Sequence, residues 1–500
     1  MKKIFIAFNI FLILFSVIFT LLAIQNHEGN IFYYLSYSIL INGLLIYTLN
    51  TKRLFFEIYF AAFIWLGFWF KYTLSLVFLN GIIYDSGPSV NMTNIDKAIL
   101  TSIIAISAVF FSFIFRNKFF KEKLYKVKKK SFFEKKYLEN RKLVIFLFVV
   151  LFSLFAILNY NYSIYQKGFI YKNEISLILV NFTKWMLLFG FSTLSCFFIF
   201  TEILRLKKIS LTLIIFAFFE IFFSYSSMLS RALIMNISVL TFSTSKYLNL
   251  IRNKKIFFFT LSILVIFMFV LNNYFSNHIR INFAQEIGNE IKNKKLNNNQ
   301  VNENNKIDVN EIVKFKVSND RKVRPDPINM TSFIIINRWS GIDSMIAVVS
   351  SKKLSFDLLF QSLKEKKTLN NKTFYETTFN VDYDGGKEVM IGKKRILKGN
   401  TLPGIISFLF YSGNHFFLFI TIFTLTFLFS SLEIFCKNIT NNNMIYASFI
   451  SFIICFRLFN FGYAPQDTYL FIISVVFSVL SIFLLSRFNF FFLKKNNNMQ

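Results

Sequence analysis

The layout of apolar stretches constrains this chain more than any other feature. About a dozen of them approach the length of a bilayer crossing, and one polar stretch of 127 residues, 276–402, interrupts them late in the chain. The hydrocarbon core of a bilayer is roughly 30 Å thick, so a helix needs about 20 apolar residues to cross it. The pattern predicts an all-α, polytopic integral membrane protein with about 12 transmembrane helices and one large loop.

Composition agrees with this class and excludes others. Hydrophobic residues make up 55% of the chain and charged residues 16%, unlike soluble domains. The net charge of +30 does not indicate nucleic-acid binding, because the cytoplasmic loops of membrane proteins are rich in Lys and Arg. The three cysteines lie in or at the ends of apolar stretches, so neither a disulfide framework nor a metal cluster is expected. No nucleotide-binding spacing is present, and we expect no cofactor.

The charges of the loops predict the orientation. Loop 116–142 carries twelve Lys/Arg against three Glu, which places it in the cytoplasm. Alternation from this loop puts both termini in the cytoplasm and loop 276–402 in the periplasm. That long loop has 22 Lys/Arg and 14 Asp/Glu, but long loops translocate largely regardless of charge. The predicted spans are 4–24, 31–49, 54–79, 98–115, 143–159, 176–201, 210–227, 230–245, 256–275, 415–436, 444–461 and 468–486.

The chain therefore divides into residues 1–275 with nine spans, the periplasmic loop 276–402, and residues 403–500 with three spans and a cytoplasmic tail. Within the loop, segment 332–351 is apolar except at its centre, which predicts an amphipathic helix lying on the membrane surface. Segment 401–414 is apolar but short. It either enters the membrane partway or extends the helix that follows.

Ionisable side chains in and near the spans are the candidate functional residues. A charge near the bilayer centre costs roughly 2.5–3.5 kcal/mol on insertion scales, so it usually faces a partner or a cavity. Cations gather toward the predicted periplasmic side, where Arg can hold phosphate oxygens bidentately. Lys71 and Lys184 could instead extend to the membrane interface. The candidate ligands for a lipid-linked pyrophosphate are Arg231, Arg280, Arg338, Arg457, Lys71 and Lys184.

The layout resembles the Wzy-type oligosaccharide repeat-unit polymerases of bacterial surface polysaccharide synthesis. These proteins combine many spans with one large periplasmic loop toward the C-terminal third. Three local segments also look like parts of that family. Residues 230–234 (SRALI) look like a helix opening with a small residue and Arg, residues 337–343 (NRWSGID) like the loop helix, and residues 402–413 (LPGIISFLFYSG) like the re-entry segment.

The resemblance implies glycosyl transfer between two undecaprenyl-pyrophosphate-linked glycans in the bacterial inner membrane, without a metal or nucleotide sugar. It implies membrane lipids and a chain-length regulator protein as partners, and no nucleic acid. Such an enzyme must stabilise a departing pyrophosphate with preorganised cations and deprotonate an acceptor hydroxyl. The candidate bases are His278, Asp343 and Glu220.

Three other functions share parts of this pattern. An O-antigen ligase has the same layout but transfers finished polymer to a lipid A core. A polysaccharide flippase or other transporter often shows internal repeats around a midplane site, and no convincing repeat is present. A glycosyltransferase that uses a polyprenyl-phosphate sugar usually carries an acidic pair in its first external loop, where this chain offers only Glu28.

Overall fold

The computed structural model of the chain describes residues 2–274 and 336–487, apart from gaps of which the longest are 120–130, 166–175 and 246–258. Within these residues the protein is helical, as the sequence predicts. The exception is one antiparallel hairpin, formed by strands β1 Val389–Ile391 and β2 Lys394–Leu397.

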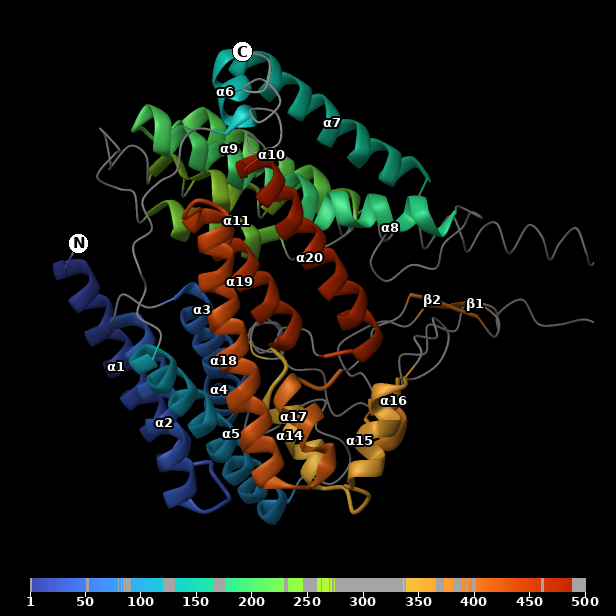
Figure 1. The fold of residues 1–500 in the computed structure, drawn as a ribbon. Coiled ribbons are helices and arrows are strands. Elements are labelled where there is room, and N and C mark those ends of the chain that lie inside the picture. Colours follow the sequence, from blue (N-terminus) through green and yellow to red (C-terminus); the bar gives the residue numbers. More distant parts are fainter. Residues whose placement is uncertain are drawn as a thin grey trace, which may run out of the picture.

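The N-terminal helices form one group, drawn in blue in Figure 1. α2 packs against both α3 and α5, and α1 packs against α2 and α4. The third helix continues through a π-helical turn, η1, because the residues on either side of η1 keep α-helical backbone angles. The group consists of α1 Lys2–Ile24, α2 Ile31–Asn50, α3 Phe55–Ile64, η1 Trp65–Phe70, α4 Lys71–Phe78 and α5 Met92–Phe119.

The middle of the chain forms a second group, drawn in teal and green in Figure 1. α10 packs against α7, α9 and α11. α8 and α9 are also one continuous helix with a π-helical turn, η2, between them. The group consists of α6 Phe132–Glu139, α7 Arg141–Tyr162, α8 Leu177–Trp185, η2 Met186–Gly190, α9 Phe191–Leu206, α10 Leu211–Ser227 and α11 Leu233–Ser245.

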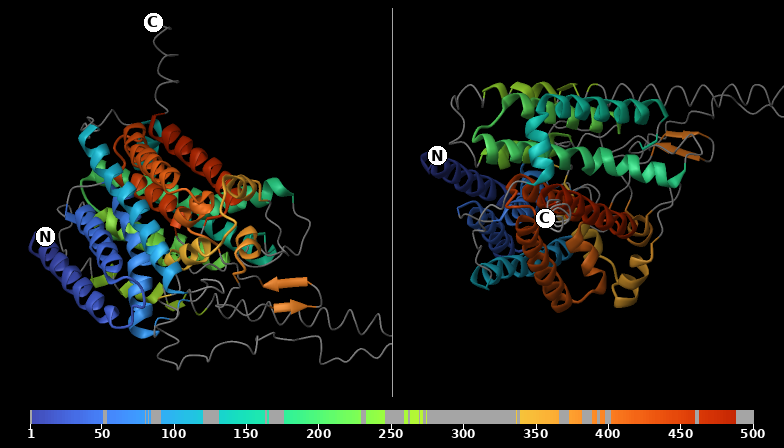
Figure 2. Two further views of the ribbon diagram at one scale, coloured as in Figure 1. Left: turned by 90° about the horizontal axis from the view of Figure 1, so that it is seen from below. Right: turned by 45° about the horizontal axis from the view of Figure 1, so that its top comes forward.

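The last three helices join the two groups, as the two views of Figure 2 show. α18 His415–Ile439 packs against α5. α19 Met444–Phe459 contacts α3 in the first group and both α9 and α11 in the second. α20 Pro465–Arg487 contacts α6, α9 and η2. One buried apolar core consequently runs through both groups.

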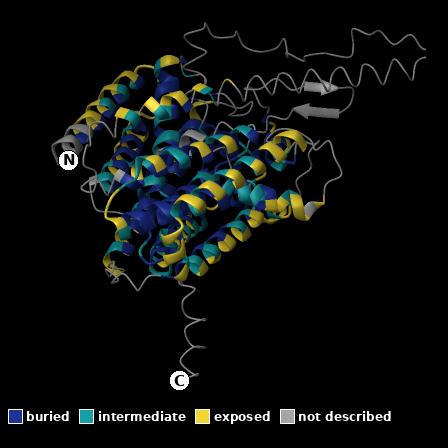
Figure 3. Ribbon diagram, turned by 90° about the horizontal axis from the view of Figure 1, so that it is seen from above, coloured by how far each residue is buried: buried dark blue, intermediate teal, exposed yellow. Residues whose placement is uncertain are grey.

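Seven helices in the described residues are long and apolar enough to cross a bilayer. Exposed residues lie along the outer faces of the helices (Figure 3), and many of them are large and apolar. Such faces suit lipid, and the chain is a helical membrane protein. The seven helices are Ile31–Leu49, Phe55–Phe78, Met92–Phe119, Arg141–Tyr162, Ile178–Leu206, His415–Ile439 and Pro465–Ser486.

The other five predicted spans also coincide with helices. Four of them contain apolar helical segments of 10–17 residues, one of which is the part Asn9–Ile24 of the 23-residue helix α1, and the fifth is α11. The predicted spans are therefore helices, whereas twelve crossings, the periplasmic loop and the orientation stay predictions. The four apolar helices are Asn9–Ile24, Leu211–Ser227, Phe259–Met268 and Met444–Phe459.

Buried carboxylates hold the first group together and join it to the C-terminal helix α18. Glu57 of α3 forms an ion pair with Arg116 of α5, and both side chains are buried. Glu433 of α18 accepts hydrogen bonds from the backbone N–H groups of Phe55 and Phe56, at 3.2 and 2.7 Å. The first N–H groups of a helix have no partner within the helix, and a carboxylate there also complements the helix dipole. Glu433 thus fixes the start of α3 against α18.

The long loop contributes a helix to the interior. α14 Ile342–Val349 is buried along its whole length and packs against α5, α17 and η1. The prediction of an amphipathic surface helix over 332–351 is wrong for this part, because the polar residues of α14 find partners inside the protein. Ser344, for example, shares a hydrogen bond of 2.9 Å with Ser407. The other described helices of the loop are α15 Phe356–Leu363 and α16 Phe374–Thr378.

Segment 401–414 forms a short buried unit of its own. It contains α17 Ile405–Leu409 and the 3-10 turn η5 Phe410–Ser412, which are buried throughout. Gly413 follows with a φ of 67°, in the left-handed region that glycine adopts at little cost. Asn414 then accepts a hydrogen bond from the Phe417 N–H at 2.9 Å and caps α18. The segment therefore does not extend the following helix.

Candidate functional site

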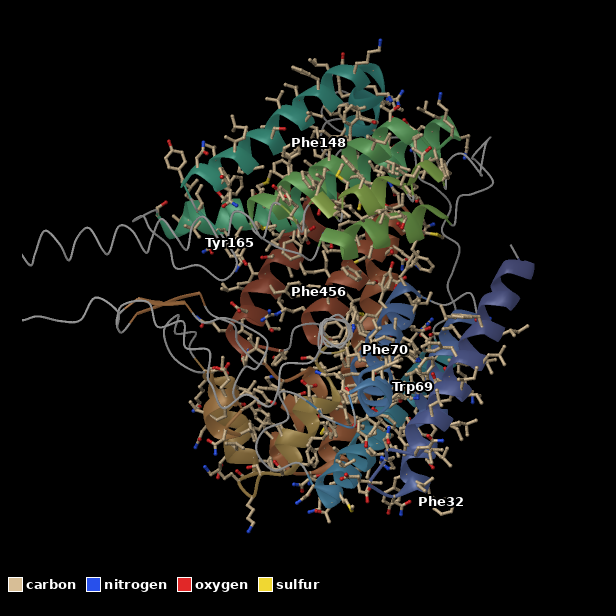
Figure 4. The ribbon with its side chains drawn as sticks, turned by 180° about the vertical axis from the view of Figure 1, so that it is seen from behind. Phe32, Trp69, Phe70, Phe148, Tyr165 and Phe456 are labelled. Carbon is tan, nitrogen blue, oxygen red and sulfur yellow. The ribbon has the colours of Figure 1, made fainter. Side chains whose placement is uncertain are left out.

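A cavity of about 580 Å³ lies where the second group meets the C-terminal helices. α8 and η2 of the second group line one side of it, and the C-terminal helices α19 and α20 line the other side. α10 and α11 contribute one residue each. Figure 4 labels two of its lining residues, Tyr165 beside the green helices and Phe456 on a red helix. Its volume is in the range of small-molecule sites. We call it the main cavity.

Arg457 is held in place at the turn between α19 and α20. Its Nε donates a hydrogen bond to Thr468 Oγ1 at 3.1 Å, and its Nη2 donates to the Ala464 carbonyl oxygen at 2.8 Å. The same Nη2 lies 4.0 Å from Asp467 Oδ2, and both of these side chains are partly exposed. The guanidinium is therefore oriented by its neighbours before any ligand binds.

Lys184 reaches the same cavity from α8. Its Nζ lies 5.0 Å from the centre of the Tyr165 ring, a cation–π distance. Tyr165 is itself fixed by the buried Asn159 at the end of α7. The Tyr165 N–H donates to Asn159 Oδ1 at 2.7 Å, and Asn159 Nδ2 donates to the Tyr165 carbonyl oxygen at 3.1 Å. The structure thus brings together two predicted phosphate ligands, Lys184 and Arg457.

The main cavity is polar at one end and apolar at the other. Arg457 lies in the last turn of α19 and Asp467 in the first turn of α20, so both are near the turn that connects these helices. Phe452 of α19 and Phe477 of α20 lie farther from this turn, and their side chains are apolar. With a rise of 1.5 Å per residue, Asp467 and Phe477 are about 15 Å apart along α20.

This arrangement suits an amphiphilic anion. The two cations that line the cavity, Lys184 and Arg457, can bind phosphate oxygens, and Arg does so with two parallel hydrogen bonds. The aromatic walls can bury an apolar chain, at about 25 cal/mol per Å² of apolar surface removed from water. Asp467 provides a carboxylate beside Arg457 and could accept a proton.

Lys71 and Asp343 lie elsewhere, and they bind each other. Lys71 Nζ is 2.9 Å from Asp343 Oδ2 and donates a hydrogen bond to the Trp339 carbonyl oxygen at 2.9 Å. Asp343 Oδ1 accepts the Gly341 N–H at 3.0 Å. Both side chains are almost fully buried, and neither lines the main cavity. Lys71 and Asp343 therefore form a pair that joins α14 to the start of α4, and their predicted roles as phosphate ligand and base stay predictions.

Glu220 also lies outside the main cavity. It is fully buried on α10 and accepts hydrogen bonds from Ser192 at 3.2 Å and Ser224 at 3.0 Å. It borders a separate hollow of about 10 Å³, which is room for about one water molecule. Asn236 lines both this hollow and the main cavity. Glu220 therefore does not line the main cavity, and its predicted role as a base stays a prediction.

Four predicted site residues lie outside the described residues: Arg231, Arg280, Arg338 and His278. Conversely, three residues that line the main cavity are not among the candidates predicted from the sequence: Asp467, Asn181 and Asn236. Asp467 carried a signal, because it is a carboxylate at the start of an otherwise apolar segment, ten residues after Arg457. The two asparagines carried none, since isolated amides in apolar segments are ordinary.

Among the described residues, no group of three or more His, Cys, Asp or Glu side chains is placed to hold a metal ion. No protein-family model, curated protein or solved structure matches the chain.

Proposed function

We propose that the chain is a membrane glycosyltransferase that polymerises undecaprenyl-pyrophosphate-linked oligosaccharide repeat units into a surface polysaccharide, either O-antigen or capsule. The observation that carries this proposal is the main cavity, where the two cations Lys184 and Arg457 line an otherwise largely aromatic site. A lipid-linked pyrophosphate has the same division into an anionic head and an apolar chain. The resemblance to Wzy-type polymerases in layout supports the same reaction.

In the proposed reaction, a hydroxyl oxygen at the non-reducing end of the incoming repeat unit attacks the anomeric carbon of the growing chain. The bond from this carbon to the pyrophosphate oxygen breaks, and undecaprenyl pyrophosphate leaves with the electron pair. Lys184 and Arg457 stabilise the charge that develops on the leaving group. Asp467 takes the proton from the attacking hydroxyl, because it is the one carboxylate that lines the main cavity in the described residues.

Deletion of the gene, followed by electrophoresis of the surface polysaccharide, tests the proposal. We expect the ladder of chain lengths to collapse to a single repeat unit and to be restored by the wild-type gene. Arg457→Ala should not restore it. Lys136→Ala is the matched control, since Lys136 is an exposed cation paired with Glu139 away from the main cavity, and it should restore the ladder fully.

Other results would indicate other functions. Finished polymer that accumulates on its lipid carrier would identify a ligase. Single lipid-linked units that accumulate on the cytoplasmic side would identify a flippase. An unchanged ladder and unchanged capsule in the deletion strain would contradict the proposal.

A further inference from the structure

The main cavity has an apolar rim that faces outward between α8 and α20. Phe182 of α8 is 46% exposed, and Ile473 and Phe477 of α20 are 66% and 51% exposed. All three also line the main cavity. Because these lining side chains are also about half exposed or more, the cavity is not closed over them and they lie at its opening. We call these three residues the mouth.

The two helices of the mouth diverge from a common contact. α20 packs against η2, at the end of α8, and Figure 1 shows the helices separating from there. Trp185 connects them: its Nε1 donates to the Ser474 carbonyl oxygen at 3.3 Å, and its ring meets Phe477 edge-on with 4.7 Å between ring centres. The mouth is thus bounded at its inner end by Trp185.

Both helices belong to segments long and apolar enough to span the bilayer, Ile178–Leu206 and Pro465–Ser486. An apolar opening between two such helices faces acyl chains, not water. A polyprenyl chain is much longer than the roughly 15 Å that the main cavity extends along α20. Most of such a chain must therefore remain outside the cavity, and it loses no apolar burial if it leaves into the bilayer.

We propose that the mouth between α8 and α20 admits the polyprenyl chain of an anionic lipid sideways from the bilayer, while its phosphates bind Lys184 and Arg457. The identity of the lipid rests on the proposed function. The lipid never has to leave the membrane, since only its head and the first part of its chain enter the protein. Phe182, Ile473 and Phe477 contact the chain where it passes between the helices.

Narrowing the mouth tests this proposal. The purified full-length protein in lipid nanodiscs is titrated with undecaprenyl phosphate, and binding is followed by native mass spectrometry. Ile473→Trp should weaken binding by about tenfold or more. Ile472→Trp is the matched control, because Ile472 is 51% exposed on the same helix but does not line the cavity. It should bind within about twofold of wild type. Equal binding by Ile473→Trp and wild type would overturn the proposal.

Photolabelling of the wild-type protein gives a second test that needs no variant to fold. A polyprenyl phosphate with a diazirine on one of the isoprene units nearest the phosphate should label peptides of α8 and α20 around the mouth. Labelling confined to other helices would contradict the route. The polymerisation assay is separate: a protein that polymerises but is insensitive to Ile473→Trp disproves the mouth alone. If the protein binds lipid through the mouth but deletion of its gene leaves the ladder unchanged, the proposed function alone is disproved.

Discussion

Arg457 shows how one side chain can be oriented for an anion. Its Nε and Nη2 are already bound to Thr468 and to the Ala464 carbonyl oxygen. Lys cannot reproduce this geometry, because its ammonium is a single point charge on a flexible stem. We expect Arg457→Lys to weaken the binding of undecaprenyl phosphate by roughly tenfold despite the conserved charge. Titration in nanodiscs measures this, and wild-type affinity in the variant would show that charge alone suffices.

Asp467 is expected to affect the rate more than binding. Removal of a general base typically costs about 10²- to 10⁴-fold in rate. We expect Asp467→Asn to slow polymerisation of lipid-linked repeat units in proteoliposomes by that order, with lipid affinity changed by no more than about threefold. Asp357→Asn, at an exposed position on α15, should leave the rate unchanged. A normal rate in Asp467→Asn would remove this residue from the mechanism.

The Lys71–Asp343 pair is expected to matter for stability. Removal of one partner of a buried ion pair leaves an uncompensated charge and costs about 3–5 kcal/mol. Asp343→Ala should therefore lower the thermal unfolding midpoint of the detergent-purified protein strongly. Replacement of both residues, Lys71→Met with Asp343→Ala, should recover much of the loss because no charge is left buried. If the double variant is as unstable as Asp343→Ala, the ion pair is not what α14 depends on.

His27 gives the stability a dependence on pH. It lies in the turn between α1 and α2, its Nδ1 is 2.8 Å from the Tyr72 hydroxyl, and burial lowers its pKa below the ordinary 6.5, against opposing contributions from Asn30, Asp96 and Glu28. As the pH falls through 6.5, the unfolded chain binds a proton before the folded protein does, so the free energy of unfolding decreases. We expect a lower unfolding midpoint at pH 5 than at pH 7.5. His27→Gln should reduce that difference, and an unchanged difference would exclude His27 as its source.

At the scale of single residues, the sequence indicated two cations that line the main cavity but not how the other candidates are paired. Lys184 and Arg457 were identifiable because a charge in an apolar span needs a reason to be there. The same reasoning applied equally to Lys71, and nothing in the sequence indicates that its partner is Asp343, in a loop far along the chain. Pairing between distant segments depends on tertiary packing, which hydropathy does not encode.

At the scale of elements, the contact between Gly67 and Gly341 controls how α14 docks. A Cβ on Gly341 would lie 2.1 Å from the Gly67 carbonyl oxygen, and neither backbone can move without shifting a helix. We expect Gly341→Ala to displace α14 and to increase hydrogen–deuterium exchange over Ile342–Val349. Gly43→Ala is the control, since a Cβ there meets nothing within 4 Å and Ala favours a helix. Unchanged exchange in Gly341→Ala would contradict this docking.

The long helices were predictable because hydrophobic length is a local property of the sequence. α14 was not, since eight mostly apolar residues next to a polar centre fit both a membrane surface and a buried contact. The deciding partners, η1 and Ser407, come from other segments. The two π-helical turns were also unpredictable, because their sequences are as apolar as the helices around them.

At the scale of the whole molecule, the main cavity lies between the second helix group and the C-terminal helices α19 and α20. A ligand bound there contacts both, and it binds the folded protein without an equivalent site in the unfolded chain. At a free concentration one hundred times its dissociation constant, such a ligand adds about 2.7 kcal/mol to the free energy of unfolding. We expect undecaprenyl phosphate to raise the unfolding midpoint of the wild-type protein, and Arg457→Ala to need more lipid for the same rise. An equal response from both would place the lipid elsewhere.

The π-helical turn Met186–Gly190 sets the angular phase between the two halves of one long helix. Such a turn accommodates one more residue than an α-helical turn, and each residue of an α-helix advances about 100° around its axis. Deletion of Leu187 would remove that extra residue and convert the turn to ordinary helix, so α8 and α9 would keep about the same angular phase. Lys184 and Phe182 would then still line the cavity while α9 keeps its packing on α19. The same deletion within the regular part of α9 would instead rotate α8 by about 100° and turn Lys184 away from the cavity, so η2 is the point at which this helix can change its length by one residue without losing its alignment.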